Sequence, residues 1–164
     1  MQWHRVFFSF TILLFGLCLA GEKPNFSGTW VLDKDKSFST QPGLEQTMTI
    51  THAGDSLKLV GKQKSARGEV DLNESYGLDG KQSDFTPLNP PNAKGKRKAY
   101  LLPNDKGLIV EDEIVSDSPN GPATQLITRK WRLSPDGSVL TVDYFIDNAR
   151  GSFESKRVFV RKTN

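Results

Sequence analysis

Short runs in which apolar and polar residues alternate, separated by turn residues, are the feature that most restricts how this chain can fold. In residues 48–52, Met48, Ile50 and His52 fall on one face and threonines fall on the other. A period of two is typical of β-strands with one buried face. No run is long and periodic enough for a large amphipathic helix, and the only helical candidate is a single turn near residues 33–37. The pattern therefore predicts an all-β fold.

Turn residues divide the chain into about nine or ten predicted strands. Gly and Asp or Asn cluster at the clearest boundaries, which are residues 53–56, 104–107, 118–122, 134–137 and 148–151. Prolines at 87, 90 and 91 cannot donate to a strand ladder, so residues 84–95 are predicted to form a loop or an irregular edge. The next strand is expected to run from about Lys96 to Leu102.

Short turns between successive strands imply an up-and-down meander, which removes its exposed edges most simply by closing into a barrel. We predict a single antiparallel up-and-down β-barrel of about 8–10 strands, a size that can hold a small ligand. The predicted domain spans residues 25–164.

Residues 1–20 are predicted to be a cleaved export signal. Arg5 precedes an apolar run over residues 6–19, which is shorter than the roughly 20 residues that a spanning helix needs. Small residues at Cys18 and Ala20 suit a cut after Ala20, and a cut after Gly21 is the near alternative. Cys18 also fits a lipoprotein signal in part, but Leu17 stands where that pattern requires a small residue. The chain is thus expected to be extracytoplasmic, either periplasmic or secreted, without a stable membrane anchor.

Cleavage would remove the only cysteine and His4, and it would leave His52 as the sole histidine. Disulfides are then impossible, and a zinc site is not expected because it needs three or four convergent ligands. The formal net charge of +3 falls by one when Arg5 is removed, which is too small to indicate a nucleic-acid partner. We predict no metal and no cofactor.

Residues 25–32 read Asn-Phe-Ser-Gly-Thr-Trp-Val-Leu, in which Gly28 and Trp30 form a Gly-x-Trp motif. This segment resembles the opening strand of the calycins, the class that contains lipocalins and fatty-acid-binding proteins. It is also similar to the start of the mature domain in exported bacterial lipocalin-like proteins of unassigned function. The resemblance implies that Trp30 closes one end of the barrel beneath an Arg of a late strand, here Arg157 or Arg161. The chain departs from the lipocalins because no helix follows its last predicted strand.

The leading hypothesis is that the barrel cavity binds a small apolar or amphipathic molecule and that the protein is a monomer without enzymatic activity. The candidate wall residues are aromatic or cationic side chains of the predicted strands, namely Tyr76, Tyr100, Arg129, Trp131, Tyr144 and Phe145. The second hypothesis is a filled barrel that acts as an envelope interaction or structural module without a ligand.

The third hypothesis is an enzyme that uses carboxylates inside the barrel. Glu111 and Glu113 share one side of a predicted strand with Ile109 and Val115. If that side is interior, the two carboxylates can pair with Arg129; the alternative is a solvated outer face, because charges are rarely buried without compensation. There is no Gly-x-Ser-x-Gly motif for a nucleophilic serine.

Two surface features remain. The basic run Lys94, Lys96, Arg97, Lys98 is predicted to be a solvated loop, with contact to an anionic envelope surface as the alternative. Asn25 and Asn73 each begin an Asn-x-Ser sequon, which matters only in a host that glycosylates.

Overall fold

The computed structural model describes residues 23–90, 92–103, 107–119 and 121–163. The predicted signal and its cleavage site at Ala20 or Gly21 lie outside these residues. Ten strands make up the described part: β1 (Gly28–Leu32), β2 (Glu45–Ala53), β3 (Ser56–Ser65), β4 (Gly68–Gly77), β5 (Asp79–Phe85), β6 (Lys94–Leu101), β7 (Leu108–Ser118), β8 (Gly121–Leu133), β9 (Val139–Asn148) and β10 (Gly151–Arg161).

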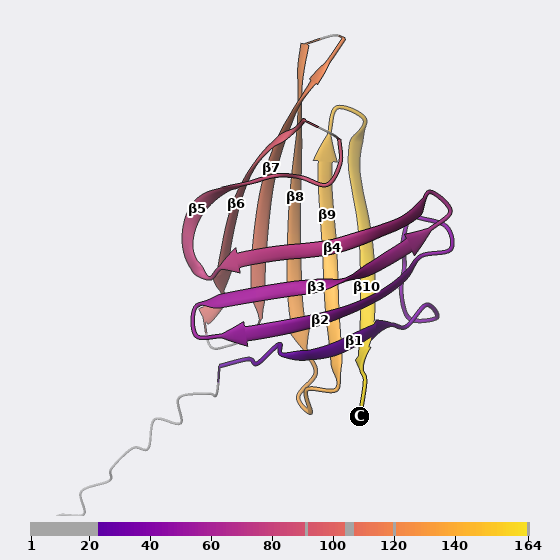
Figure 1. The fold of residues 1–164 in the computed structure, drawn as a ribbon, viewed down its shortest axis with the longest axis vertical. Helices are drawn as coiled ribbons and strands as arrows, with labels where there is room; N and C mark the ends of the chain where they lie inside the picture. Colours follow the sequence, from indigo (N-terminus) through magenta and orange to yellow (C-terminus); the bar gives the residue numbers. More distant parts are fainter. Residues whose placement is uncertain (1–22, 91, 104–106, 120, 164) are drawn as a thin grey trace, which may run out of the picture.

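All ten strands belong to one antiparallel sheet with the order β4-β3-β2-β1-β10-β9-β8-β7-β6-β5. The first strand pairs with the last, so the sheet curls back on itself. In Figure 1, β1 to β4 cross in front of β6 to β10, which run upright behind them. The predicted all-β, up-and-down barrel is confirmed in a nearly closed form, since β4 and β5 are the two ends of the sheet.

The loop predicted over residues 84–95 is confirmed with narrower bounds, and the helical turn predicted near residues 33–37 is not observed. β5 ends at Phe85 and β6 begins at Lys94, so only residues 86–93 connect the two strands. Residues 34–36 form a turn in which Ser37 N donates to Lys34 O at 3.3 Å, rather than a helical turn. No helix of the described part is both long and apolar enough to cross a membrane.

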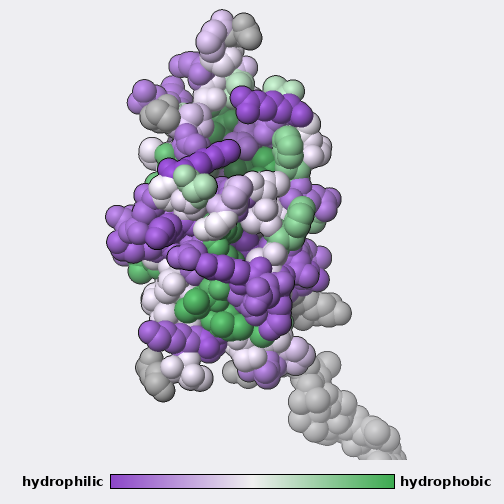
Figure 2. All heavy atoms as spheres, turned by 90° about the vertical axis from the view of Figure 1, so that its right-hand side faces the viewer, coloured by the Kyte–Doolittle hydropathy of each residue, from purple (hydrophilic) through white to green (hydrophobic). Residues whose placement is uncertain are grey.

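The period-two pattern places alternate side chains in a common core, which includes Trp30, Leu140 and Phe159, each with no exposed area. Opposite side chains cover the outside. Figure 2 shows one side of the molecule, where hydrophilic residues dominate and hydrophobic ones appear between them.

Trp30 and Arg161 close one end of this core. The Arg161 guanidinium lies 4.6 Å from the Trp30 ring centroid, and it donates to Ser27 O at 2.7 Å and Gly137 O at 2.9 Å. Gly28 has φ +143°, and a Cβ there would lie 3.0 Å from Arg161 Nη1. The Gly-x-Trp motif therefore needs glycine at its first position for both backbone conformation and space. Arg157 is not part of this closure, which corrects its assignment to the motif.

Candidate functional site

A cavity of about 480 Å³ lies inside the barrel, and Trp131 and Phe159 are among the residues that line it. Its apolar wall includes Met48, Leu59 and Val142. Its polar wall includes side chains from six strands, namely Gln46, Gln63, Glu74, Arg129, Tyr144 and Arg157. Binding pockets for small molecules usually measure about 300–1,000 Å³ and combine an apolar wall with a few polar groups, and this cavity has both properties.

Arg157 carries the unbalanced charge of the cavity. It lies on β10 with 9% of its surface exposed, and its Nη1 donates to Gln46 Oε1 at 2.7 Å and Gln63 Oε1 at 2.9 Å. Its guanidinium lies 4.6 Å from the Tyr144 ring centroid. Among the described residues, no carboxylate lies within 4.0 Å of it, and its Nε has no hydrogen-bond partner. A buried cation held only by neutral groups is suited to an anionic ligand.

The other interior charges balance one another in what we call the interior ion network: Glu74, Arg97, Asp112 and Arg129. Asp112 accepts from Arg97 Nε at 2.6 Å, Arg97 Nη2 at 2.9 Å and Arg129 Nη2 at 2.6 Å. Glu74 Oε2 lies 2.9 Å from Arg97 Nη2 and 3.1 Å from Arg129 Nη1. It also accepts from the Tyr76 hydroxyl at 2.7 Å. Two guanidinium groups thus face two carboxylates, and the network is neutral.

The interior ion network also sets the protonation state of Glu74, and burial sets that of its neighbour Tyr76. Burial acts to raise the pKa of Glu74, but the charges of Arg129 and Arg97 outweigh it, and hydrogen bonds from Tyr76 and Arg129 lower the pKa further, to about 2. Burial raises the pKa of Tyr76 well above its usual range. Glu74 is therefore ionised and Tyr76 neutral at physiological pH.

The predicted wall residues divide between the two faces of the barrel. Tyr76, Arg129 and Trp131 are buried inside it, and Tyr144 lines the cavity. Tyr100 lies on the outer face, where its hydroxyl contacts Glu111 at 3.4 Å. Phe145 is also outside, with 42% of its surface exposed, so the predictions for Tyr100 and Phe145 as wall residues were wrong.

Glu111 and Glu113 also lie outside, which corrects the hypothesis of an interior pair with Arg129. Asp112, between them, is only 5% exposed and takes the interior position. Neighbouring strand residues point to opposite faces, so one carboxylate of the three pairs with Arg129 and two cannot.

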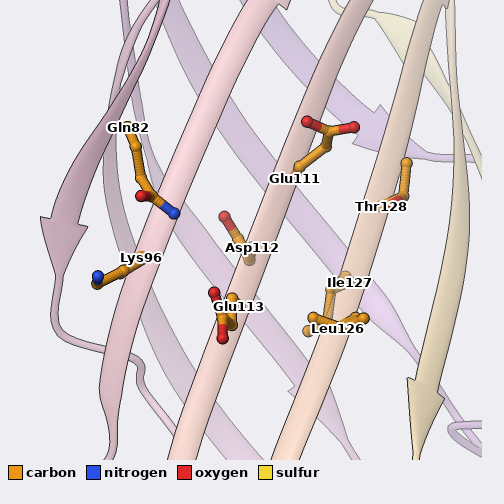
Figure 3. A pocket seen from close by; sticks show the side chains of 8 residues that line it. All are labelled: Gln82, Lys96, Glu111, Asp112, Glu113, Leu126, Ile127 and Thr128. Atoms are coloured by element: carbon orange, nitrogen blue, oxygen red, sulfur yellow. The ribbon is translucent and has the colours of Figure 1, made fainter.

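Glu111 and Glu113 line a shallow outer depression of about 280 Å³, together with Gln82, Lys96, Leu126 and Thr128. Figure 3 shows these side chains spread over β5 to β8 without a common point of convergence. No group of three or more His, Cys, Asp or Glu side chains in the described ranges is arranged to hold a metal ion. The depression therefore offers charge but no enclosed site.

The basic run at residues 94–98 contains the residue that the sequence reasoning missed. It forms strand β6 rather than a solvated loop, and Arg97 faces inward with 5% of its surface exposed while the lysines on either side are exposed. The small residues Gly95 and Ala99, in phase with Arg97, were the available signal. A Cβ at Gly95 would lie 2.4 Å from the Phe85 ring, which shows how closely this inner face is packed.

The ten-stranded, nearly closed up-and-down sheet with a partly apolar cavity defines a barrel fold of the lipocalin and fatty-acid-binding-protein type. No protein-family model and no curated protein sequence matches the chain.

Solved structures are similar in fold. Zebrafish ileal bile acid-binding protein, complexed with cholic acid, aligns with a TM-score of 0.54 and 14% identity over 84% of this chain and 98% of its own. Human cRBP IV aligns with a TM-score of 0.49 and 16% identity over 85% and 99% of the two chains. Secretory abundant heat soluble protein 4 from Ramazzottius varieornatus gives a TM-score of 0.49 at 9% identity, covering 87% and 99%. At these identities the likeness concerns the fold alone.

Proposed function

We propose that this protein is a non-enzymatic, monomeric binding protein that holds a small amphipathic acid in its barrel cavity. The observation that carries the proposal is Arg157, a buried guanidinium without a carboxylate partner in the described residues, at the wall of a cavity of about 480 Å³. The apolar wall suits a hydrocarbon body, and Arg157 suits an anionic end group. The zebrafish bile acid-binding protein, which has a similar fold, is complexed with cholic acid.

The polar anchor of this proposal is Arg157 and not Arg129. Arg129 already has Glu74 and Asp112 as ion-pair partners, at 3.1 Å and 2.6 Å. An anion at Arg129 would have to compete with two carboxylates, whereas an anion at Arg157 would replace only glutamine oxygens. The void also argues against the filled-barrel hypothesis, in which large side chains would meet across the interior.

Calorimetric titration with dodecanoate and with the neutral dodecanol tests the anionic preference. Dodecanoate should bind more tightly than dodecanol, and Arg157→Met should remove most of that difference. Charge-assisted hydrogen bonds are worth about 1.5–3 kcal/mol, which corresponds to roughly 10- to 150-fold in affinity. Arg132→Met, at a half-exposed outer arginine, should leave the preference unchanged. If neither compound binds, or if Arg157→Met keeps the preference, the proposal is wrong.

Native mass spectrometry of protein isolated from its own host identifies the natural ligand by the mass that remains bound. The N-terminal residue of the same material tests the predicted signal cleavage, because a protein cut after Ala20 begins at Gly21 and one cut after Gly21 begins at Glu22. An N-terminus that retains residues 1–20 would refute cleavage of the signal.

A further inference from the structure

The barrel wall has one boundary where the strands are not hydrogen-bonded to each other. β4 and β5 are the two ends of the sheet, and across this boundary β4 contacts β6 instead. We call the boundary between β4 on one side and β5 and β6 on the other the seam. In Figure 1, β4 is the uppermost of the strands crossing the front, and the connection between β5 and β6 passes above it. Opening the seam would break no strand ladder, since β4 keeps its pairing with β3.

Side chains hold the seam together. Glu74 and Tyr76 of β4 reach across to Arg97 of β6 and Arg129 of β8. The Arg97 guanidinium lies 4.7 Å from the Tyr76 ring centroid and 4.1 Å from the Phe85 ring centroid, so it stacks on residues from both sides. Glu74 is the carboxylate that β4 contributes to these contacts.

The interior ion network can release Glu74 without leaving its two arginines without an anion. Asp112 alone accepts three of the hydrogen bonds from Arg97 and Arg129, and all three residues lie on the same side of the seam. The Glu74 side chain is 21% exposed, whereas that of Asp112 is 4% exposed. Glu74 is therefore the carboxylate that can return to water at the lower cost.

The cavity extends to the seam. Val70, Leu72 and Glu74 of β4 line it on one side, and Leu88 and Asn89 of the connection between β5 and β6 line it on the other. Leu88 is 61% exposed and Val70 is 43% exposed, so apolar side chains flank the cavity where it meets solvent. An amphipathic molecule that passed between β4 and this connection would remain in contact with apolar groups.

We propose that the seam is the route by which the ligand enters and leaves the cavity, and that the Glu74 bridge to Arg97 and Arg129 keeps this route closed. This inference rests on the proposed binding function. When Glu74 turns to solvent, β4 separates from β6 while Asp112 continues to hold both arginines. The rate of exchange, and not the affinity, is then set by how often this bridge breaks.

The rate of ligand dissociation tests the inference. The dodecanoate complex is mixed with excess phosphatidylcholine vesicles that take up released ligand, and tryptophan emission is followed, since Trp131 lines the cavity. Glu74→Gln should raise the dissociation rate about tenfold, because a neutral amide holds the two arginines weakly. The substitution also adds positive charge to the cavity, and that effect alone would slow the release of an anion. The two explanations thus predict opposite signs.

Glu69→Gln is the matched control, because Glu69 lies on the same strand with an exposed ion pair to Lys62 on the outer face. It should leave the dissociation rate unchanged. Glu74→Asp, which keeps the charge on a shorter side chain, should give an intermediate rate and guards against misfolding of the amide variant. Hydrogen exchange of β4 amides should accelerate in Glu74→Gln, while the amides of β8 and β9 remain protected.

The outcomes separate this inference from the proposed function. If dodecanoate does not bind the unaltered protein, the proposed function fails and the route fails with it. If dodecanoate binds but leaves Glu74→Gln no faster than the unaltered protein, the seam is not the route and the binding function stands.

Discussion

Replacing Asp112 with asparagine removes the carboxylate that accepts hydrogen bonds from both buried arginines of the interior ion network. Arg97 Nε and Arg129 Nη2 each donate to it at 2.6 Å, and the Asp112 side chain is only 4% exposed. Without this charge, two buried guanidinium groups share Glu74 alone. Breaking a buried ion pair by removing one partner costs about 3–5 kcal/mol, so Asp112→Asn should lower the free energy of unfolding by that amount.

The corresponding change in melting temperature follows from the size of the domain. Unfolding entropies near 2.1 cal/mol/K per residue, taken over residues 23–163, convert this loss to a Tm decrease of about 10–17 °C. Urea titration and thermal unfolding, both followed by circular dichroism at pH 7, measure the two quantities independently.

Asp71→Asn is the control, since Asp71 is 83% exposed and lies 3.8 Å from Lys62. It should leave the transition within experimental error of the unaltered protein. If Asp112→Asn unfolds cooperatively with a loss below about 1 kcal/mol, then the interior carboxylate does not balance the two arginines and the network is not coupled as described.

Three further substitutions test the closure, the packing and the pH dependence. Arg161→Met removes hydrogen bonds to two carbonyls and the stacking on Trp30. It should lower the free energy of unfolding in urea titrations by about 1.5–3 kcal/mol, whereas Lys162→Met should leave that free energy unchanged. Gly61→Ala places a Cβ 2.2 Å from Thr47 O and should lower the free energy of unfolding by about 1–3 kcal/mol or more. Gly77→Ala, whose new Cβ has its first contact at 3.8 Å, should lower it less, and equal losses in the two variants would refute the close packing at Gly61. The pKa of Glu74, about 2 in the folded state, lies below its unfolded value of 4.5, so its stabilisation is complete above about pH 4.5 and is lost as pH falls toward 2. Unfolding free energies measured from pH 7 to pH 3 should therefore fall less steeply for Glu74→Gln than for the unaltered protein, and parallel curves would contradict the assignment.

The amino-acid sequence by itself determined the fold class and the closed end of the barrel. Period-two alternation and turn residues are local properties, and they specify strands and their order along the chain without knowledge of long-range contacts. Gly28 and Trp30 were found from the sequence because they match the calycin Gly-x-Trp motif, which lies within three residues. The structure then showed that Arg161, and not Arg157, packs on Trp30.

Only the tertiary structure decided which face of several strands is interior. Around Glu111, apolar residues occur on both sides of the strand: Leu108 and Val110 alternate with Ile109, so the pattern has no unique phase. Pairing with β6 and β8 resolves it by turning Asp112 inward and Glu111 outward. Arg97 was hidden in the same way, because a buried arginine cannot be told from its exposed lysine neighbours until Asp112 and Glu74 are brought to it from other strands. Charge compensation in the interior depends on residues distant in the chain, and no local pattern records it.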